Sequence, residues 1–115
     1  MIQSYVLNSA LYWFDAEFDC SAFWDGVHVN MDLFGQYVST SGINYRADQG
    51  AVIDSPILVA VGRHDYVAPY TEWQDAYSTL PRMTLAVFER SGHTPQWEEA
   101  ELFDAKVAEW LKSLR

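Results

Sequence analysis

The 115-residue sequence predicts an α/β fold with parallel strands, and three observations support this prediction. Two apolar runs, at 57–61 and 83–88, have the length and composition of buried strands. A helix-forming segment separates these runs, and a second helical segment follows the later one. Two buried strands joined by a helix form a unit that implies a parallel sheet with helices on its outside.

The first predicted strand is the run 57–61, which follows a proline and ends at Gly62. Five consecutive apolar residues between a proline and a glycine are typical of a strand that is buried on both faces. Pro69 suits the first turn of a helix, because proline lacks the N–H that this turn leaves without a partner. We therefore predict a helix from Pro69 to about Thr79, before Pro81.

The second predicted strand is Met83 to Phe88, and a loop at 89–94 follows it. The last helix should begin at Pro95, with Glu98 and Glu99 near its positive end, where the helix dipole favours carboxylates. Apolar residues at helical spacing predict the stripe of this helix that is buried against the sheet: Leu102, Phe103, Val107, Trp110, Leu111 and Leu114.

The chain divides near residue 50 into a helical segment, 1–50, and an α/β segment, 51–115. In the first segment, apolar spacing predicts a short amphipathic helix within 2–12 and a second helix from Met31 to Val38. Asn30 is a suitable N-cap for the second helix. The polar stretch 42–50 predicts a loop. Two strands are too few for a stable parallel sheet, so this sheet needs neighbours.

The composition excludes several classes of protein. A net charge of −9 disfavours nucleic-acid binding, because phosphate backbones would be repelled. No apolar run is long enough to span a membrane. The first residues show no charged stretch followed by an apolar run, so we expect no signal peptide. A single cysteine, Cys20, cannot form an internal disulfide and fits a reducing compartment, so we expect a cytoplasmic protein.

The acidic residues are unevenly distributed. Residues 1–45 contain no lysine or arginine, yet five carboxylates fall there: Asp15, Glu17, Asp19, Asp25 and Asp32. A solvated acidic face is the simpler explanation. The alternative is an electrostatic field that attracts a cationic substrate, such as a free amine.

Two residues that can carry chemistry follow the two predicted strands. Asp65 comes just after the first strand and His93 just after the second. Ligands of open α/β sheets meet residues beyond the carboxyl ends of the strands, so we expect these side chains to come together. The three histidines lack metal-ligand spacing, and the chain lacks a phosphate-binding glycine loop, so we expect neither a metal nor a cofactor.

These motifs resemble the end of an α/β-hydrolase. A strand followed by G-x-x-D (62–65) with a proline four residues on precedes a second strand and S-G-H-x-P (91–95) opening a helix. The order of acid before histidine is also that of the family. The resemblance implies the C-terminal portion of the α/β-hydrolase fold, with Asp65 as the acid that orients His93 and His93 as the general base. It also implies that Gly92 lets the backbone turn sharply before the histidine.

The first 45 residues narrow the resemblance. The stretches 13–15, 18–21, 24–26 and 29–31 look like the helical cap of proline-iminopeptidase-like hydrolases. Members of this group cleave N-terminal proline from peptides, or hydrolyse amides and esters. The resemblance implies that acidic cap groups hold the ammonium of the substrate, although no individual carboxylate can be aligned.

A serine nucleophile is missing from these residues. None of the nine serines has glycine at both −2 and +2, as a G-x-S-x-G nucleophile elbow requires. We expect the elbow and the oxyanion hole to lie upstream of Met1, and the chain alone to be inactive. It would then be a truncated product, one chain of a split enzyme, or a remnant that folds by self-association.

Two functions therefore remain open. The first is a hydrolase segment that supplies Asp65 and His93 and works with a complementary chain that carries the serine. The second is a non-catalytic module that associates with itself or binds peptides or a partner through its aromatic surface. In both cases we expect an oligomer or a heteromeric complex, because the edges of two buried strands are adhesive.

Overall fold

The computed structural model describes residues 2–40, 53–74, 80 and 82–115. The first part contains α1 (Ile2–Leu7), two 3-10 turns (Ser9–Leu11 and Ser21–Trp24) and α2 (Met31–Thr40). The second part contains β1 (Ile57–Gly62), α3 (Tyr70–Gln74), β2 (Met83–Phe88), α4 (Pro95–Glu98) and α5 (Ala100–Ser113). This order of helices followed by strand, helix, strand and helix confirms the predicted fold class.

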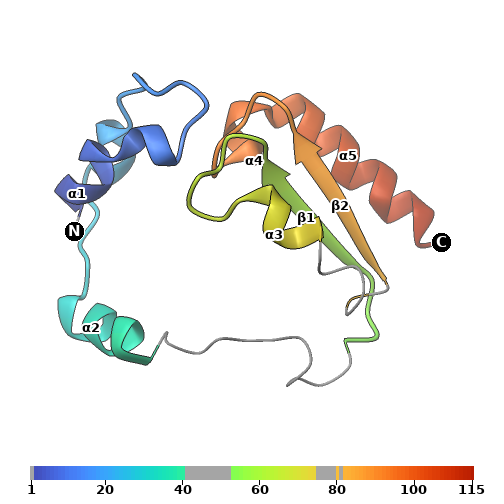
Figure 1. The fold of residues 1–115 in the computed structure, drawn as a ribbon, viewed down its shortest axis with the longest axis horizontal. Coiled ribbons are helices and arrows are strands. Elements are labelled where there is room, and N and C mark those ends of the chain that lie inside the picture. Colours follow the sequence, from blue (N-terminus) through green and yellow to red (C-terminus); the bar gives the residue numbers. More distant parts are fainter. Residues whose placement is uncertain (1, 41–52, 75–79, 81) are drawn as a thin grey trace.

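The two strands pair in parallel, with Ile57 opposite Met83 and Gly62 opposite Phe88. The carboxyl ends of the strands are therefore level, and the loops that leave them start side by side. Figure 1 shows the segment between α1 and α2 facing this end of the sheet, while α5 runs alongside the strands. The fold thus brings three chain segments together at one edge of the sheet.

Local signals account for the helices of the first segment. The Asn30 side chain accepts a hydrogen bond from the Leu33 amide at 3.0 Å, which is the N-cap predicted for α2. The predicted N-terminal helix is present as α1 and the 3-10 turn after it. The predicted loop at 42–50 lies outside the described residues, and so does the end of the helix expected from Pro69 to Thr79. The division of the chain near residue 50 stays a prediction.

The last helix differs from the prediction because it is broken. α4 ends at Glu98, and Glu99 leaves the helical region with φ −128° and ψ 51° before α5 begins at Ala100. Adjacent residues of a continuous helix point in different directions around its axis. The break at Glu99 instead allows the Glu98 and Glu99 carboxylates to reach the same loop, as described below.

Burial is lower than the sequence predicts. The strand 57–61 was expected to be buried on both faces, but only Val61 and Gly62 of β1 are buried, and Ile57 to Ala60 are half-exposed. In the stripe of α5, Leu102, Leu111 and Leu114 are 43–52% exposed. These predictions are wrong because no element within the described ranges covers those side chains. The small apolar core consists of Trp13, Cys20, Val61, Met83, Ala86 and Phe88.

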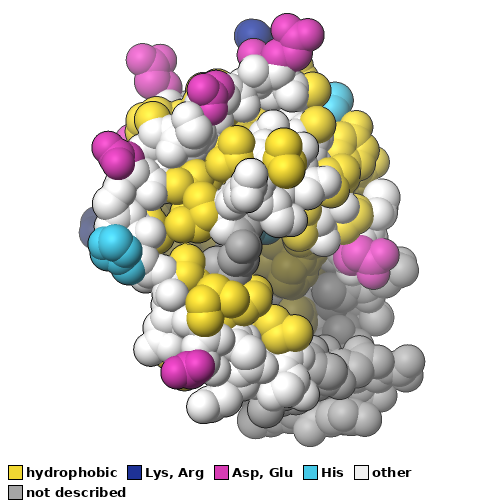
Figure 2. All heavy atoms as spheres, turned by 90° about the vertical axis from the view of Figure 1, so that its left-hand side faces the viewer, with side chains coloured by type: hydrophobic (Ala, Val, Ile, Leu, Met, Phe, Trp, Pro, Cys, Tyr) yellow, Lys and Arg dark blue, Asp and Glu magenta, His cyan; other side chains and the backbone are white. Residues whose placement is uncertain are grey.

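Large apolar side chains of the first segment are exposed. Leu7 is 78% exposed, Leu33 62% and Met31 58%. Figure 2 shows hydrophobic side chains on the face formed by α1 and α2, the helices to which these three residues belong.

Among the described helices, none is long and apolar enough to cross a membrane. The cytoplasmic location expected from the sequence stays a prediction.

Gly62 offers a test of the packing at the end of β1. A Cβ on Gly62 would overlap the carbonyl oxygens of Ser91 and Gly92, which are backbone atoms that cannot rotate away. We expect Gly62→Ala to lower the free energy of unfolding by roughly 1–3 kcal/mol, the usual effect of overpacking. Urea denaturation followed by circular dichroism measures it.

Gly35→Ala is the matched control. Gly35 lies within α2, and nothing lies within 4 Å of the point that a Cβ would occupy there. Alanine should therefore stabilise the chain by up to about 1 kcal/mol through its higher helix propensity. Equal unfolding midpoints for Gly62→Ala and the wild type would contradict the packing described here.

Candidate active site

Asp65 lies in the turn directly after β1 and is buried, with 5% of its surface exposed. Its Oδ1 accepts hydrogen bonds from the backbone N–H groups of Val67 and Ala68, both at 2.9 Å. An aspartate that binds amides two and three residues ahead closes its own turn, so the local sequence is sufficient to hold this carboxylate. Oδ1 is thus occupied, and Oδ2 is left to meet a second group.

That second group is the imidazole of His93, in the loop between β2 and α4. Its Nδ1 lies 2.8 Å from Asp65 Oδ2. An ionised carboxylate can only accept, so the geometry assigns the proton of neutral His93 to Nδ1 and leaves Nε2 as the basic nitrogen. The His93 side chain is 41% exposed, whereas the Asp65 carboxylate is nearly inaccessible. The structure therefore brings together the two residues that the sequence singled out.

The N-terminal segment contacts both loops through its backbone. The Leu11 carbonyl accepts the Tyr66 amide at 3.1 Å, and the Tyr12 carbonyl accepts the His93 amide at 2.5 Å. The Tyr12 ring also meets the imidazole edge to face, with 5.7 Å between ring centroids. The carbonyls of two consecutive residues thus bind the Asp65 turn and the His93 loop, one each.

Gly92 is required at this point for a different reason from the one predicted. Its φ is not positive, so it does not provide a special turn. A Cβ on Gly92 would instead overlap the carbonyl group of Tyr12 and approach the Cα of Trp13 to 2.8 Å. Only glycine allows the N-terminal backbone to come this close to the histidine loop.

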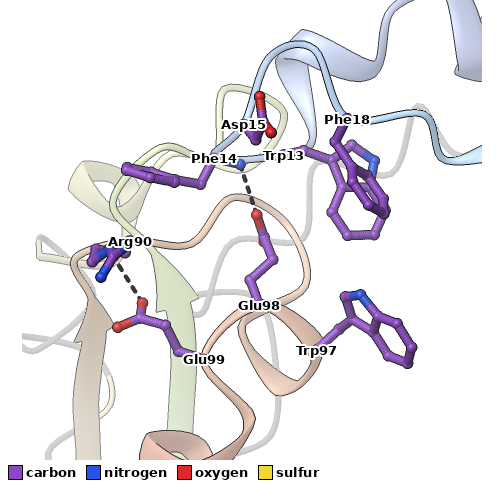
Figure 3. A pocket seen from close by; sticks show the side chains of 8 residues that line it. All are labelled: Trp13, Phe14, Asp15, Phe18, Arg90, Trp97, Glu98 and Glu99. Carbon is purple, nitrogen blue, oxygen red and sulfur yellow. Dashed lines mark hydrogen bonds between the residues drawn. The ribbon is translucent and has the colours of Figure 1, made fainter.

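Glu98 and Glu99 accept hydrogen bonds from backbone amides of the site, a role that the sequence did not predict. Glu98 accepts the Gly92 amide at 2.8 Å and the Phe14 amide at 2.7 Å. Glu99 Oε2 accepts the Arg90 amide at 2.9 Å and the Ser91 hydroxyl at 2.7 Å. Figure 3 shows the Glu98 carboxylate bonded to the Phe14 backbone and the Glu99 carboxylate bonded to the Arg90 backbone. From the sequence, these glutamates were expected to stabilise the start of the helix through its dipole. No local sequence pattern indicates that they bind the loop backbone instead.

An ion pair joins the starts of the two loops. Arg63 follows β1 and Glu89 follows β2, and their side chains meet at 2.6 Å. The Arg63 guanidinium also lies 4.2 Å from the centre of the Tyr70 ring. The hydrogen bond from Arg63 holds the pKa of the Glu89 carboxyl below its usual range. Both side chains are exposed, so this pair aligns the loops more than it stabilises the fold.

Two aromatic pockets lie between the N-terminal segment and α4. The first, of about 410 Å³, is shown in Figure 3 and is lined by Trp13, Phe14, Asp15, Phe18, Arg90, Trp97, Glu98 and Glu99. The second, of about 370 Å³, includes Thr94, the neighbour of His93, and is otherwise lined by Tyr5, Trp13, Phe23, Trp24, Val27, Gln96 and Trp97. Neither pocket is lined by Asp65 or His93 themselves.

The acidic residues of the first segment are exposed, and two of them have local structural roles. Asp15 Oδ1 accepts the Glu17 amide at 3.0 Å, and Asp19 Oδ1 accepts the Ser21 amide at 2.9 Å. The hydrogen bond from Ser21 lowers the pKa of Asp19. These turns favour the solvated-face explanation for Asp15 and Asp19. The residues that the structure describes include no group of three or more acidic, histidine or cysteine side chains that could hold a metal ion.

The other two histidines take no part in the Asp65–His93 hydrogen bond. His28 is exposed. His64 is half-buried, with its ring 4.9 Å from that of Phe14 and 6.5 Å from that of Tyr66. Cys20 is fully buried.

Comparison with known proteins finds relatives among the α/β-hydrolases. The AB hydrolase superfamily protein YclE of Bacillus subtilis (strain 168) is 35% identical over 96 residues, which are 79% of this chain and 33% of that protein. A 2-hydroxy-6-oxononadienedioate/2-hydroxy-6-oxononatrienedioate hydrolase of Pseudomonas putida is 36% identical over 62 residues, which are 54% of this chain and 22% of that protein. The corresponding hydrolase of Burkholderia vietnamiensis is 40% identical over 60 residues, 52% of this chain and 21% of that protein.

The chain is therefore related to the α/β-hydrolases, and its parallel strands and flanking helices form part of that fold. It spans between a fifth and a third of the length of these relatives. No protein-family model matches the chain, and no solved structure matches it significantly.

Substitutions of Asp65 distinguish its hydrogen bonds to the backbone amides from its hydrogen bond to His93. Asp65→Ala leaves the Val67 and Ala68 amides and the His93 Nδ1 without their acceptor, so we expect the free energy of unfolding to fall by roughly 1–3 kcal/mol. Asp65→Asn keeps an acceptor for both amides and should cost less. Because its NH₂ group would face Nδ1, it should shift neutral His93 to the Nε2–H tautomer, which ¹⁵N NMR of the imidazole detects.

Retention of the Nδ1–H tautomer in Asp65→Asn would show that Asp65 does not determine the protonation of His93.

Tyr5 predicts a pH dependence of stability. Burial raises the pKa of the Tyr5 phenol above its ordinary value of about 10, and nearby Tyr12, Cys20, Asp65 and Glu98 act in the same direction. The neutral phenol is thus favoured in the folded state, so its contribution is complete below pH 10 and is lost as the pH rises through the folded-state pKa. Urea midpoints measured from pH 7 to pH 11 should fall more steeply for the wild type than for Tyr5→Phe.

The two proteins should keep a constant stability difference between pH 7 and pH 9, because the phenol is neutral there in both states. Parallel curves up to pH 11 would contradict the assignment to Tyr5.

Proposed function

We propose that this chain supplies the acid and the general base of a serine-hydrolase active site, with Asp65 as the acid and His93 as the base. One observation carries the proposal: a buried carboxylate, held by two backbone amides, accepts a hydrogen bond from the Nδ1 of a partly exposed imidazole at 2.8 Å. This is the arrangement that a histidine base requires, because it holds the ring in one orientation and directs Nε2 away from the acid.

The chemistry follows from the exposed Nε2. As a serine hydroxyl attacks the carbonyl carbon of the substrate, Nε2 takes its proton and the Asp65 carboxylate stabilises the resulting imidazolium. His93 then gives the proton to the leaving group as the tetrahedral intermediate collapses to an acyl-serine. Water attacks this ester in the second half of the reaction, with His93 again taking a proton and returning it to the serine.

The serine and the oxyanion donors come, in this proposal, from further polypeptide. None of the nine serines has glycines at −2 and +2, and Ser91, the serine closest to His93 in sequence, donates its hydroxyl to Glu99. The exposed apolar side chains of α1 and α2, among them Leu7, Met31 and Leu33, support the existence of an additional covering segment or a second copy of the chain. An assembly with such a polypeptide, and inactivity of the 115 residues alone, are both part of the proposal.

Two candidate substrate classes differ in charge. The cap-like first segment supports peptide N-termini, amides or esters, as in proline-iminopeptidase-like hydrolases. The named relatives support 2-hydroxy-6-oxo-dienedioates, which are dianions. A first segment without lysine or arginine up to residue 45 favours a neutral or cationic acyl substrate over a dianion.

A chimera tests the proposed roles. This chain replaces the matching 96 residues of YclE, and the product is assayed with p-nitrophenyl acetate, proline p-nitroanilide and a fluorophosphonate that labels reactive serines. We expect His93→Ala to lower kcat/KM at least about a thousand-fold, and Asp65→Asn to lower it substantially, because the members of such a triad act as a unit. The unjoined chain should not be labelled.

His28→Ala is the control, since His28 is exposed and belongs to neither loop of the site. Hydrolysis or labelling that survives His93→Ala unchanged would exclude the catalytic role. Partner binding that persists in both active-site variants would then favour the alternative, a non-catalytic binding module.

The assembly is tested separately by light scattering. We expect the purified chain to form a dimer or larger species, because its apolar surface on α1, α2 and α5 remains uncovered by the described residues. A monodisperse 13.2 kDa monomer that unfolds cooperatively would contradict self-association.

A further inference from the structure

The loop that carries His93 is held through its backbone by groups that lie outside the loop. The Arg90 amide is bound by Glu99, the Gly92 amide by Glu98, and the His93 amide by the Tyr12 carbonyl. Three of the four N–H groups from Arg90 to His93 are therefore fixed by groups outside the loop.

The two glutamates use their oxygens differently. Glu99 accepts both of its hydrogen bonds, from Arg90 and Ser91, on the same oxygen. Glu98 uses both oxygens: Oε2 accepts the Gly92 amide, with the Thr94 hydroxyl at 3.3 Å, and Oε1 accepts the Phe14 amide. Glu98 thus forms a bridge between the histidine loop and a segment 84 residues away in sequence.

The contacts of Glu98 flank the Tyr12 contact in sequence order. Tyr12 binds the amide of His93 itself, and Glu98 binds the residues before and after it, Gly92 and Thr94. Asp65 cannot follow a displaced imidazole, because the Val67 and Ala68 amides hold its carboxylate. A shift of the His93 loop away from Asp65 would therefore lengthen the hydrogen bond between the two side chains.

We propose that Glu98 is a positioning residue, whose carboxylate bridges Gly92 and Phe14 and thereby holds the His93 imidazole against Asp65. The proposal rests on the catalytic role proposed above for that pair, and adds a residue that does not touch the reacting atoms. Hydrogen bonds to an ionised acceptor are stronger than neutral ones, so a carboxylate suits this bridge better than an amide.

Because Glu98 uses both of its carboxylate oxygens and Glu99 uses one, substitution of each by glutamine gives a matched pair of variants. In Glu99→Gln the amide oxygen can take the position of Oε2 and keep both hydrogen bonds. In Glu98→Gln one oxygen is replaced by NH₂, which must face a backbone N–H of either Gly92 or Phe14 and repel it. The two variants have the same change in charge and shape at adjacent positions, and differ in whether a donor loses its acceptor.

The experiment uses the 115-residue chain labelled with ¹⁵N and needs no catalytic activity, so it can fail or succeed independently of the chimera assay. The imidazole ¹⁵N shifts of His93 report its tautomer, and hydrogen exchange reports the Gly92 amide. We expect Glu98→Gln to convert His93 to a mixture of tautomers and to speed Gly92 exchange about ten-fold or more. Glu99→Gln should retain the wild-type signals.

Glu98→Asp gives a second comparison, because it keeps both carboxylate oxygens and should retain more of the Nδ1–H tautomer than Glu98→Gln. Wild-type His93 shifts in Glu98→Gln would overturn the proposal. So would simultaneous loss of the Val61 and Val87 amide signals in that variant, because Glu98 would then support the whole sheet and not the histidine in particular.

Discussion

The site depends on the close approach of three backbones, which two glycines permit. The Cα of Gly62, at the end of β1, lies against the carbonyl groups of Ser91 and Gly92 in the histidine loop. The Cα of Gly92 in turn lies against the backbone of Tyr12 and Trp13. A Cβ at either glycine would push these backbone segments apart and lengthen the hydrogen bonds between them. The side-chain contacts of the site therefore depend on this close backbone packing.

Within this stack, the carboxylates of Asp65, Glu98 and Glu99 all have hydrogen-bond donors as partners. Asp65 is buried but accepts three hydrogen bonds, so it avoids the large cost of an unpaired buried carboxylate. Glu98 and Glu99 satisfy loop amides that a surface loop would otherwise leave to water. Within the pair itself, the nitrogen that Asp65 leaves unbound is Nε2 of His93, which is the atom that proton transfer needs.

Patterns in the sequence predicted those features of the fold that depend on local interactions. The apolar runs predicted both strands, their parallel pairing followed from the intervening helix, and the positions after the strands predicted that Asp65 and His93 would meet. The contact between Phe14 and Glu98 spans 84 residues and has no sequence signal, because it depends on where the N-terminal segment lies in space. The helix break at Glu99 was missed for the same reason: it is stabilised by the loop that Glu99 binds.

The burial of the strands was overestimated because the sequence encodes surfaces for contacts that the described residues do not make. A run such as 57–61 is as apolar as a central strand, yet most of it is partly exposed here, and two leucines of α5, Leu102 and Leu111, are exposed. Hydrophobic burial contributes about 25 cal/mol per Å², so burying one such side chain contributes at least as much free energy as a typical hydrogen bond of the site. The hydrogen-bond network around His93 depends on glycines and carboxylates of this chain. The roles proposed for Asp65 and His93 therefore rest on a geometry that these residues form without a nucleophile elbow among the nine serines.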